Sequence, residues 1–271
     1  MKHPLATSIL IALSLVAAAA WIRPHAQASS ATPEEAARTP VVVELFTSEG
    51  CPSCPPADEL LAHLSEQQNL KNAEVIALEE HVDYWNNLGW SDPFSSGDWT
   101  ARQYNYAGVL GNVNAYTPQM VVDGQAEFVG SSTWKARHAI QEAAGRAKTP
   151  VTLTAARADG TNRVNVSANV GKLADTTPGN AAEVWLAITE TGLHSAVTRG
   201  ENAGEDLHHA AVVRSMRKIG EAKAEGETSF TGDATVPLQK EWKRENLRAV
   251  VFVQEKKSRR ILGAAEIRIA P

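Results

Sequence analysis

The fold is decided by residues 41–64, VVVELFTSEGCPSCPPADELLAHL. Its first six residues are apolar and mostly β-branched apart from Glu44, a composition typical of a buried strand. Pro52 is acceptable in the first turn of a helix, because its missing N–H would be unpaired there. Apolar residues then recur at helical spacing: Ala57, Leu60, Leu61 and Leu64. The stretch therefore predicts a buried strand followed by a helix that begins near Cys51.

Further elements continue this pattern up to about residue 149. A second strand is expected at residues 74–83, followed by an irregular insertion rich in aromatic residues at 84–99 and a helix through about Leu110. The dipeptide Asp123-Gly124 lies between two short apolar runs, which predicts a hairpin. Ser131 or Ser132 can cap a final helix. The predicted order over residues 40–149 is strand, helix, strand, helix, hairpin, helix, an α/β domain.

Past residue 150 the sequence alternates between apolar and polar residues. Examples are VTLTA at 151–155 and VNVSANV at 164–170, and β-type runs recur at 184–188, 247–253 and 261–269. Short alternating strands with polar turns are typical of an antiparallel sandwich. We therefore place a domain boundary near Thr149 and expect a β-rich, sandwich-like domain over residues 150–271.

Residues 1–28 have the three parts of a secretory signal peptide. Lys2 gives a basic start, residues 9–20 are apolar, and Ala26-Gln27-Ala28 supplies small residues before the expected cleavage. An uncleaved N-terminal anchor is the alternative, although the apolar run is shorter than the ~20 residues of a membrane helix. Residues 29–39 predict a flexible lead-in. We expect a periplasmic or secreted protein with no integral membrane segment after signal cleavage.

Charge and cysteine content narrow the functional classes. The 271 residues carry a formal net charge of −5 and no basic cluster, which argues against nucleic acid as a partner. The two cysteines lie three positions apart. A bridge between them would close a loop too small to contribute much stability, and a chain of this length can stabilise itself by core burial. The pair therefore calls for a chemical explanation.

Cys51-Pro52-Ser53-Cys54, at the junction of a strand and a helix, suits thiol–disulfide exchange. The positive end of the helix dipole lowers the pKa of a thiol such as Cys51, so that the reactive thiolate forms. Cys54 would then resolve the mixed disulfide. A metal site and an inert structural pair are the alternatives. A zinc ribbon would need a second cysteine pair, which the sequence lacks.

Three other residues are candidates for the same site. Pro118 follows Thr117 and opens a predicted strand, where it removes a hydrogen-bond donor; in the cis form it would present backbone groups to an extended substrate, whereas a loop proline is the plain alternative. Glu44 lies in an apolar strand and could take the proton of Cys54 through water, or it faces solvent. His81 could join Cys51 and Cys54 in a copper site, or be hydrogen-bonded in the core.

Other polar and aromatic residues have two readings each. His208 and His209 are neighbours on a strand and should point to opposite faces, so joint metal ligation is not expected. The aromatic side chains of the insertion either wall a peptide groove near the cysteines or form a small core of their own: Tyr84, Trp85, Trp90 and Trp99.

The combination of a strand, a Cys-x-x-Cys turn, a helix and Thr117-Pro118 before a hairpin resembles the thioredoxin superfamily. More narrowly, the chain resembles a secreted family catalogued as domain of unknown function 1223. The motifs that carry this likeness are ELFTSEGCPSCPPAD at 44–58, HVDYW at 81–85, GW at 89–90, YTPQMVVDG at 116–124, RGENAG at 199–204 and VVR at 212–214. The superfamily resemblance implies Cys51 as attacking thiol, Cys54 as resolving thiol and Pro118 as cis-proline.

The predicted function is a thiol–disulfide oxidoreductase that acts on exported proteins or on a redox partner protein. No cofactor is expected for that reaction. A copper-binding or copper-delivery protein that uses Cys51, Cys54 and His81 is one alternative, and a non-catalytic binding module is the other. The insertion at residues 84–99 accounts for the long separation between Cys51 and Pro118, and it is expected to reshape the substrate face.

Overall fold

The computed structural model describes Met1 and residues 38–111, 114–158, 160–223 and 226–269. The predicted signal peptide lies outside the described residues, apart from Met1, and of the expected lead-in only residues 38 and 39 are described. The described residues from Arg38 onward belong to one compact unit. Among the described residues, no helix has the length and apolar character needed to cross a membrane.

The first part of this unit has the predicted order of elements. They are β1 (Thr39–Thr47), α1 (Pro55–Gln67), β2 (Ala73–His81), α2 (Gly97–Leu110), β3 (Gln119–Val122), β4 (Ala126–Val129) and α3 (Thr133–Ala144). The β3–β4 hairpin turns at Asp123 and Gly124, whose φ angles are 46° and 66°. Both values lie in the left-handed region that favours Asp-Gly in a two-residue turn, so this hairpin is formed as predicted.

Helix α1 begins later than the sequence analysis predicts. Its first residue is Pro55, with Cys54 at the N-cap position, so Cys51 lies in the preceding turn and not in the helix. The reason is the placement of prolines. Pro55 and Pro56 occupy the first two helical positions, where a missing N–H is tolerated because it would find no partner within the helix.

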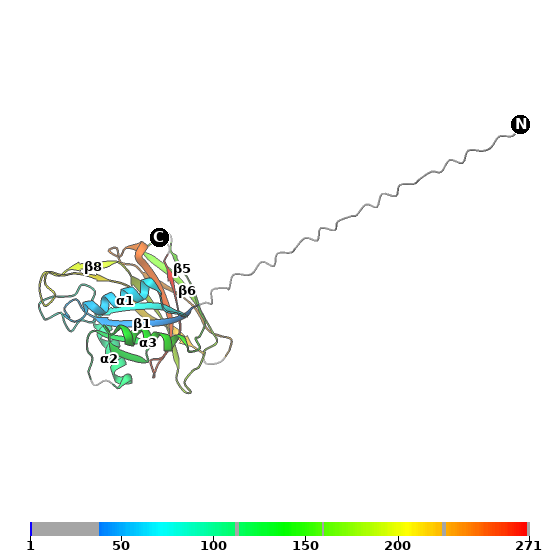
Figure 1. Ribbon diagram of the computed structural model, residues 1–271, viewed down its shortest axis with the longest axis horizontal. Coiled ribbons are helices and arrows are strands. Elements are labelled where there is room, and N and C mark those ends of the chain that lie inside the picture. The colour runs from blue at the N-terminus through cyan, green and yellow to red at the C-terminus, as the bar shows by residue number, and fades with distance from the viewer. Residues whose placement is uncertain (2–37, 112–113, 159, 224–225, 270–271) are drawn as a thin grey trace. The chain divides into compact units, whose positions relative to one another are not determined.

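The second part of the unit is rich in strands. Its elements are β5 (Val151–Arg157), β6 (Arg163–Gly171), β7 (Ala182–Glu190), β8 (Leu193–Ala196), β9 (Asp206–His209), β10 (Val212–Ala222), β11 (Thr228–Pro237), a short 3₁₀ helix (Arg244–Asn246), β12 (Leu247–Glu255) and β13 (Ile261–Arg268). The β-rich character expected after residue 150 is therefore present (Figure 1).

One large sheet joins the two parts. Its eight strands are ordered β13-β12-β7-β10-β2-β1-β3-β4, while β11-β6-β5 and β8-β9 form smaller sheets. The large sheet therefore continues across the boundary expected near Thr149, and Thr149 itself donates to the carbonyl of Leu262 in β13 at 2.8 Å. The period-two pattern shows which residues face a core, but it does not say to which sheet a strand belongs.

Strand residues alternate between two covered faces of the large sheet. On one face, Val43 and Leu45 of β1 pack with residues of α1 and α3. On the same face the small β11-β6-β5 sheet packs against β7 and β12, which gives a sandwich-like layer. On the opposite face, Val42 packs with Trp99 of α2 and with strand residues of β2, β7, β10 and β12. Successive residues of β1 therefore pack into different hydrophobic cores, one on each face of the sheet.

This arrangement sets the position of the site. β1 and β2 are parallel neighbours, and their register pairs Thr47 with His81 at their carboxyl ends. The loop that follows β1 carries Cys51, and the loop that follows β2 carries the aromatic insertion. Both loops consequently leave the sheet at the same edge, the place where parallel strands most often present functional groups.

Candidate functional site

Cys51 and Cys54 form a disulfide in the turn between β1 and α1, with a Cα–Cα distance of 5.4 Å. Both cysteines are buried, whereas Pro52 and Ser53 between them are exposed. Main-chain hydrogen bonds define the turn: Cys51 N donates to Ser48 O at 3.0 Å, and Cys54 N donates to Cys51 O at 3.2 Å. The carbonyl of Cys54 then accepts the first hydrogen bonds of α1.

Thr117 and Pro118 lie beside this turn. The peptide bond between them is cis, as the sequence analysis predicts. The register of β1 and β3 pairs Phe46 with Gln119, which places Pro118 level with the end of β1. The indole of Trp85 connects the two loops. Its Nε1 donates to Thr117 Oγ1 at 2.8 Å, and its Cβ would lie 3.0 Å from a Cβ placed on Gly50.

The sequence allows two roles for the four aromatic residues of the insertion, a wall beside the cysteines or a small core, and both roles are found in the structure. Trp85 and Trp90 lie against the disulfide loop, and Trp90 Nε1 donates to Glu49 Oε2 at 2.7 Å. Trp99 instead belongs to the core under α2, and Tyr84 packs beside Phe46 and Tyr106. The insertion therefore supplies both a wall of the site and part of a core.

Glu44 is buried, and its contacts lie on the α2 face of the sheet. Arg102 Nε donates to Glu44 Oε1 at 2.6 Å, and the Tyr106 hydroxyl donates to the other carboxylate oxygen. Glu80 lies 3.4 Å from the same guanidinium. Burial, and then the charge of Glu44, raise the pKa of Glu80 well above its usual value. The role predicted for Glu44, proton transfer with Cys54, stays a prediction.

A cluster of buried histidines and carboxylates lies behind the disulfide loop. His81 Nδ1 is 2.7 Å from Asp92 Oδ2, and His81 Nε2 is 3.3 Å from Glu79 Oε1. His209 Nδ1 is 2.8 Å from that same Glu79 oxygen, while its Nε2 is 3.2 Å from Glu49 Oε1. All five side chains are buried. We call Glu49, Glu79, His81, Asp92 and His209 the histidine–carboxylate cluster.

The pKa values of His81 and Glu79 are shifted by the oppositely charged groups that they contact. Burial alone would lower the pKa of His81, but the adjacent Asp92 charge and hydrogen bond outweigh it and raise the pKa to about 9. Burial alone would raise the pKa of Glu79, but the charges and hydrogen bonds of His209 and His81 together outweigh it and lower the pKa to about 2. The cluster therefore carries opposite charges in close contact, shielded from water.

Asp58 is a further buried acid at this edge. It lies one helical turn after Cys54, and its Oδ1 accepts a hydrogen bond from Thr47 Oγ1 at 2.6 Å. Burial, and then the negative charge of Glu79, raise its pKa to about 8. Asp58 is therefore a protonated acid at neutral pH, on the helix that starts at the disulfide.

The disulfide turn is also held from the second half of the chain. Asn202 Nδ2 donates to the carbonyl oxygens of Glu49 at 2.8 Å and Cys51 at 3.1 Å. A third hydrogen bond runs from Glu49 N to Asp92 Oδ2 at 2.8 Å. The loop that presents Cys51 is therefore bound on both sides by buried polar groups.

The family described as Protein of unknown function (DUF1223) matches residues 42–254. The chain belongs to this family. A crystal structure of a structural-genomics protein from Agrobacterium tumefaciens is 26% identical with a TM-score of 0.61, and the match covers 85% of this chain and 94% of that one. HBP35 of Porphyromonas gingivalis is 17% identical with a TM-score of 0.64, and the match covers 87% of this chain and 77% of that one. No curated protein sequence matches the chain.

Several residues at the site of this DUF1223 chain are not among the site residues predicted from the sequence. Glu79 stands in an unusual Glu-Glu-His run that ends an apolar strand, a signal that could have marked it. His208 is exposed and His209 is buried, so the two point to opposite faces as expected. Asn202 lies in the RGENAG motif, for which the sequence offered no chemistry.

The sequence allows two roles for His81: a ligand of a copper site with Cys51 and Cys54, or a hydrogen-bonded residue in the core. Its ring nitrogens contact Asp92 and Glu79. Within the described part of the chain, the residues brought together at metal-binding distances are Glu79, His81 and His209, and this group contains no cysteine. The copper set of Cys51, Cys54 and His81 stays a prediction.

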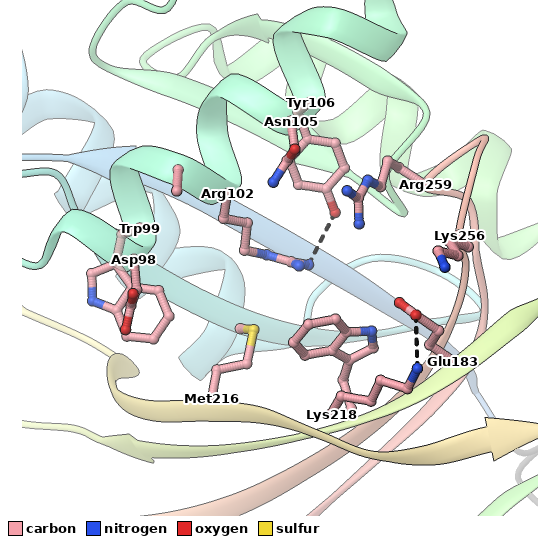
Figure 2. A pocket seen from close by; sticks show the side chains of 12 residues that line it. Asp98, Trp99, Arg102, Asn105, Tyr106, Glu183, Met216, Lys218, Lys256 and Arg259 are labelled. Carbon is pink, nitrogen blue, oxygen red and sulfur yellow. Dashed lines mark hydrogen bonds and ion pairs between the residues drawn. The ribbon is translucent and has the colours of Figure 1, made fainter.

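A separate cleft of about 530 Å³ lies on the α2 face, and neither Cys51 nor Cys54 lines it. Figure 2 shows Arg102 and Tyr106 of α2 on one side of the cleft. On the other side lie Lys218 and Glu183 of the strands, which form an ion pair of 3.0 Å with each other. Arg102 is the connection to the buried Glu44 beneath. The cleft therefore opens on the opposite side of the sheet from α1.

Proposed function

We propose that this DUF1223 chain is an exported, thioredoxin-like thiol–disulfide oxidoreductase. The observation that carries the proposal is the Cys51–Cys54 disulfide in the turn that joins a central strand to the start of α1. A bridge across three positions stabilises a fold only weakly, because it closes a very short loop. Its chemistry is therefore the better explanation of its presence.

The surroundings of the disulfide support this proposal. The strand, helix, strand, helix, hairpin, helix order is the one that the resemblance to the thioredoxin superfamily implies. Pro118 begins β3 at the level where β1 ends, and Trp85 joins the two loops. The half-buried Trp85 and Trp90 offer aromatic surface beside the exposed Pro52 and Ser53. An extended protein segment is the substrate that such a surface suits.

The reaction is an exchange of one disulfide for another. A substrate thiolate attacks Cys51 Sγ, the Cys51–Cys54 bond breaks, and the electron pair leaves on Cys54 Sγ. A second substrate thiolate then attacks the substrate sulfur of the mixed disulfide and releases Cys51. The substrate dithiol loses two electrons and the protein disulfide gains them. A redox partner protein restores the starting state by the reverse exchange.

We assign Asp58 as the acid that protonates the departing Cys54. It lies one turn after Cys54 on α1, and burial raises its pKa to about 8, so it carries a proton at neutral pH. Glu44 is the competing candidate from the sequence, and its contacts with Arg102 and Tyr106 lie on the other face of the sheet. Comparing Asp58→Asn with Glu44→Gln separates the two: only the variant of the true proton donor loses the pH dependence of disulfide reduction.

Equilibration in dithiothreitol and glutathione redox buffers, followed by thiol alkylation and mass measurement, tests the function. We expect one two-electron couple between roughly −300 and −100 mV. Cys54→Ser should trap mixed disulfides with substrate proteins at Cys51, whereas Cys51→Ser should trap none at Cys54. If no couple is found in that range, the oxidoreductase proposal is wrong, and the chain is a binding module with a structural disulfide.

Export is supported by the signal-peptide pattern and can be tested separately from the redox reaction. Residues 1–28 carry the signal-peptide pattern, and exchange between protein disulfides persists in an oxidising compartment. The mature protein recovered from a periplasmic fraction should begin at Ser29. Retention of the first 28 residues with a cytoplasmic location would contradict this part of the proposal.

A further inference from the structure

The histidine–carboxylate cluster has the geometry of a metal centre. We propose that Glu79, His81 and His209 bind one zinc ion, with Glu49 and Asp92 as the carboxylates that orient the two imidazoles. The three ligands include no cysteine, and the proposal does not rest on the proposed redox function.

The donor atoms of the three residues lie at distances that suit ligands of one ion. One atom from each of the three residues lies within 4.8 Å of the others. Glu79 Oε1 is 3.3 Å from His81 Nε2 and 2.8 Å from His209 Nδ1. Two ligands of a tetrahedral zinc ion, each about 2.0–2.1 Å from the metal, lie about 3.3 Å apart. The His81–Glu79 distance already matches this value, and the His209–Glu79 pair has to open slightly to admit the ion.

The His81 ring is oriented as a metal ligand would be. Its Nε2 is fully buried and has no hydrogen-bond partner, although Glu79 Oε1 is only 3.3 Å away. The nitrogen and the oxygen are close, but they are not aligned as donor and acceptor. Two ligands of one ion show this relationship, because each directs its lone pair at the metal and not at its neighbour. An orphaned buried nitrogen without such a ligand would be costly.

Carboxylates contact the far nitrogen of each histidine ligand. His81 uses its other nitrogen to contact Asp92 at 2.7 Å, and His209 uses its other nitrogen to contact Glu49 at 3.2 Å. A carboxylate on the far nitrogen of a histidine is the usual support of a metal ligand, because it fixes the tautomer and raises basicity. Glu79 is held in turn, since its second oxygen accepts the Ala210 N–H at 2.8 Å.

The ligand set and charge select the ion. Two imidazole nitrogens and one carboxylate suit zinc, whereas calcium and magnesium prefer oxygen ligands throughout. Three carboxylates surround two imidazoles, and this excess of negative charge favours a dication. The Phe94 ring packs against both histidine rings, with centroid distances of 5.4 and 5.6 Å. It shields the ligands from water on that side.

Phe94 also gives the ion a route. Besides covering the histidines, it lines a surface cleft of about 340 Å³ between the insertion and β10. A rotation of this ring would connect the cleft to the ligands. Phe94→Ala should therefore speed the removal of zinc by a chelator without changing how many ions are bound.

Zinc binding to the full mature chain, stripped with a chelator beforehand, tests the proposal. Calorimetry should give one Zn²⁺ per chain, and Zn²⁺ should raise the unfolding temperature. His209→Gln should weaken binding at least roughly 100-fold, whereas the neighbouring exposed His208→Gln should leave it unchanged. The Cys51→Ser, Cys54→Ser double variant should bind as the parent chain does.

X-ray absorption identifies the zinc ligands in the parent chain itself, so this test does not depend on the folding of any variant. It should show imidazole nitrogen and carboxylate oxygen around zinc, and no sulfur. Absence of stoichiometric zinc binding by the parent chain overturns the proposal, as does sulfur in the coordination shell. Equal loss of binding in His208→Gln and His209→Gln also overturns it.

Discussion

Asn202 Nδ2 donates a hydrogen bond of 3.1 Å to the carbonyl oxygen of Cys51, across 151 positions of the sequence. The same amide nitrogen also donates to Glu49 O. The β8–β9 connection therefore holds the backbone of the disulfide turn in place, although it comes from the β-rich part of the chain. This contact couples the two regions at the candidate site.

Asn202→Ala should loosen the disulfide turn. The change removes the side-chain donor of the Glu49 carbonyl and one of the two hydrogen bonds to the Cys51 carbonyl, which keeps only Cys54 N. The free energy of unfolding should therefore fall by about 1–3 kcal/mol. Reduction of the Cys51–Cys54 bond by dithiothreitol should become faster, because the turn opens more readily. Urea unfolding and thiol release measure the two effects. Glu201→Ala, an exposed neighbour in the same loop, is the control and should behave as the parent chain.

Trp85→Phe tests the link between the disulfide loop and Thr117. The phenyl ring keeps most of the packing against Gly50 but removes the 2.8 Å hydrogen bond to Thr117 Oγ1. We expect a loss of about 0.5–1.5 kcal/mol in unfolding free energy. Trp134→Phe, at an exposed position on α3, provides the comparison in the same denaturation experiment. Equal stability of the two variants would show that the Trp85–Thr117 hydrogen bond does not contribute to the free energy of unfolding.

Local features of the site could be predicted from the sequence. The cysteine spacing, the Asp123-Gly124 turn and the proline before β3 each depend on a few neighbouring residues. Burial of Glu44 is one of the two outcomes that its apolar strand allows, the other being exposure to solvent. Its partner could not be predicted, because Arg102 belongs to α2 and reaches Glu44 only through packing on one face of the sheet.

Long-range features could not be predicted. His209 meets Glu49 across 160 positions, and this contact exists only because β10 pairs with β2 in the large sheet. Period-two patterns assigned β5, β6, β7, β12 and β13 as strands, yet they contain no information on strand order. The histidine–carboxylate cluster depends on that order, so it was found only in the structure.

Arg102→Ala should be strongly destabilising. The guanidinium is buried between Glu44, Glu80 and Tyr106, and its removal leaves Glu44 without its counter-charge. The free energy of unfolding should fall by about 3–5 kcal/mol. Asn105→Ala, an exposed position on the same helix, controls for helix propensity. Adding Glu44→Gln to Arg102→Ala should restore part of the loss, because the uncompensated charge is then gone; no recovery would contradict this account.

Asp58→Asn should change how stability depends on pH. Asp58 has a folded-state pKa of about 8 against the ordinary aspartic acid pKa of 3.8, so the folded state binds its proton more tightly. The stability that this proton contributes is complete below the unfolded-state pKa and is lost as pH rises toward the folded-state value. Within that window the loss approaches about 1.4 kcal/mol per pH unit.

Asparagine keeps the shape and the hydrogen bond from Thr47 but does not titrate. The stability of Asp58→Asn relative to the parent chain should therefore increase between about pH 5 and about pH 8. Urea midpoints in the presence of a chelator measure this difference without interference from metal. Glu59→Gln, an exposed neighbour on α1, should show a constant difference over the same range. A constant difference for Asp58→Asn as well would mean that Asp58 is ionised throughout, and it could not then be the proton donor to Cys54.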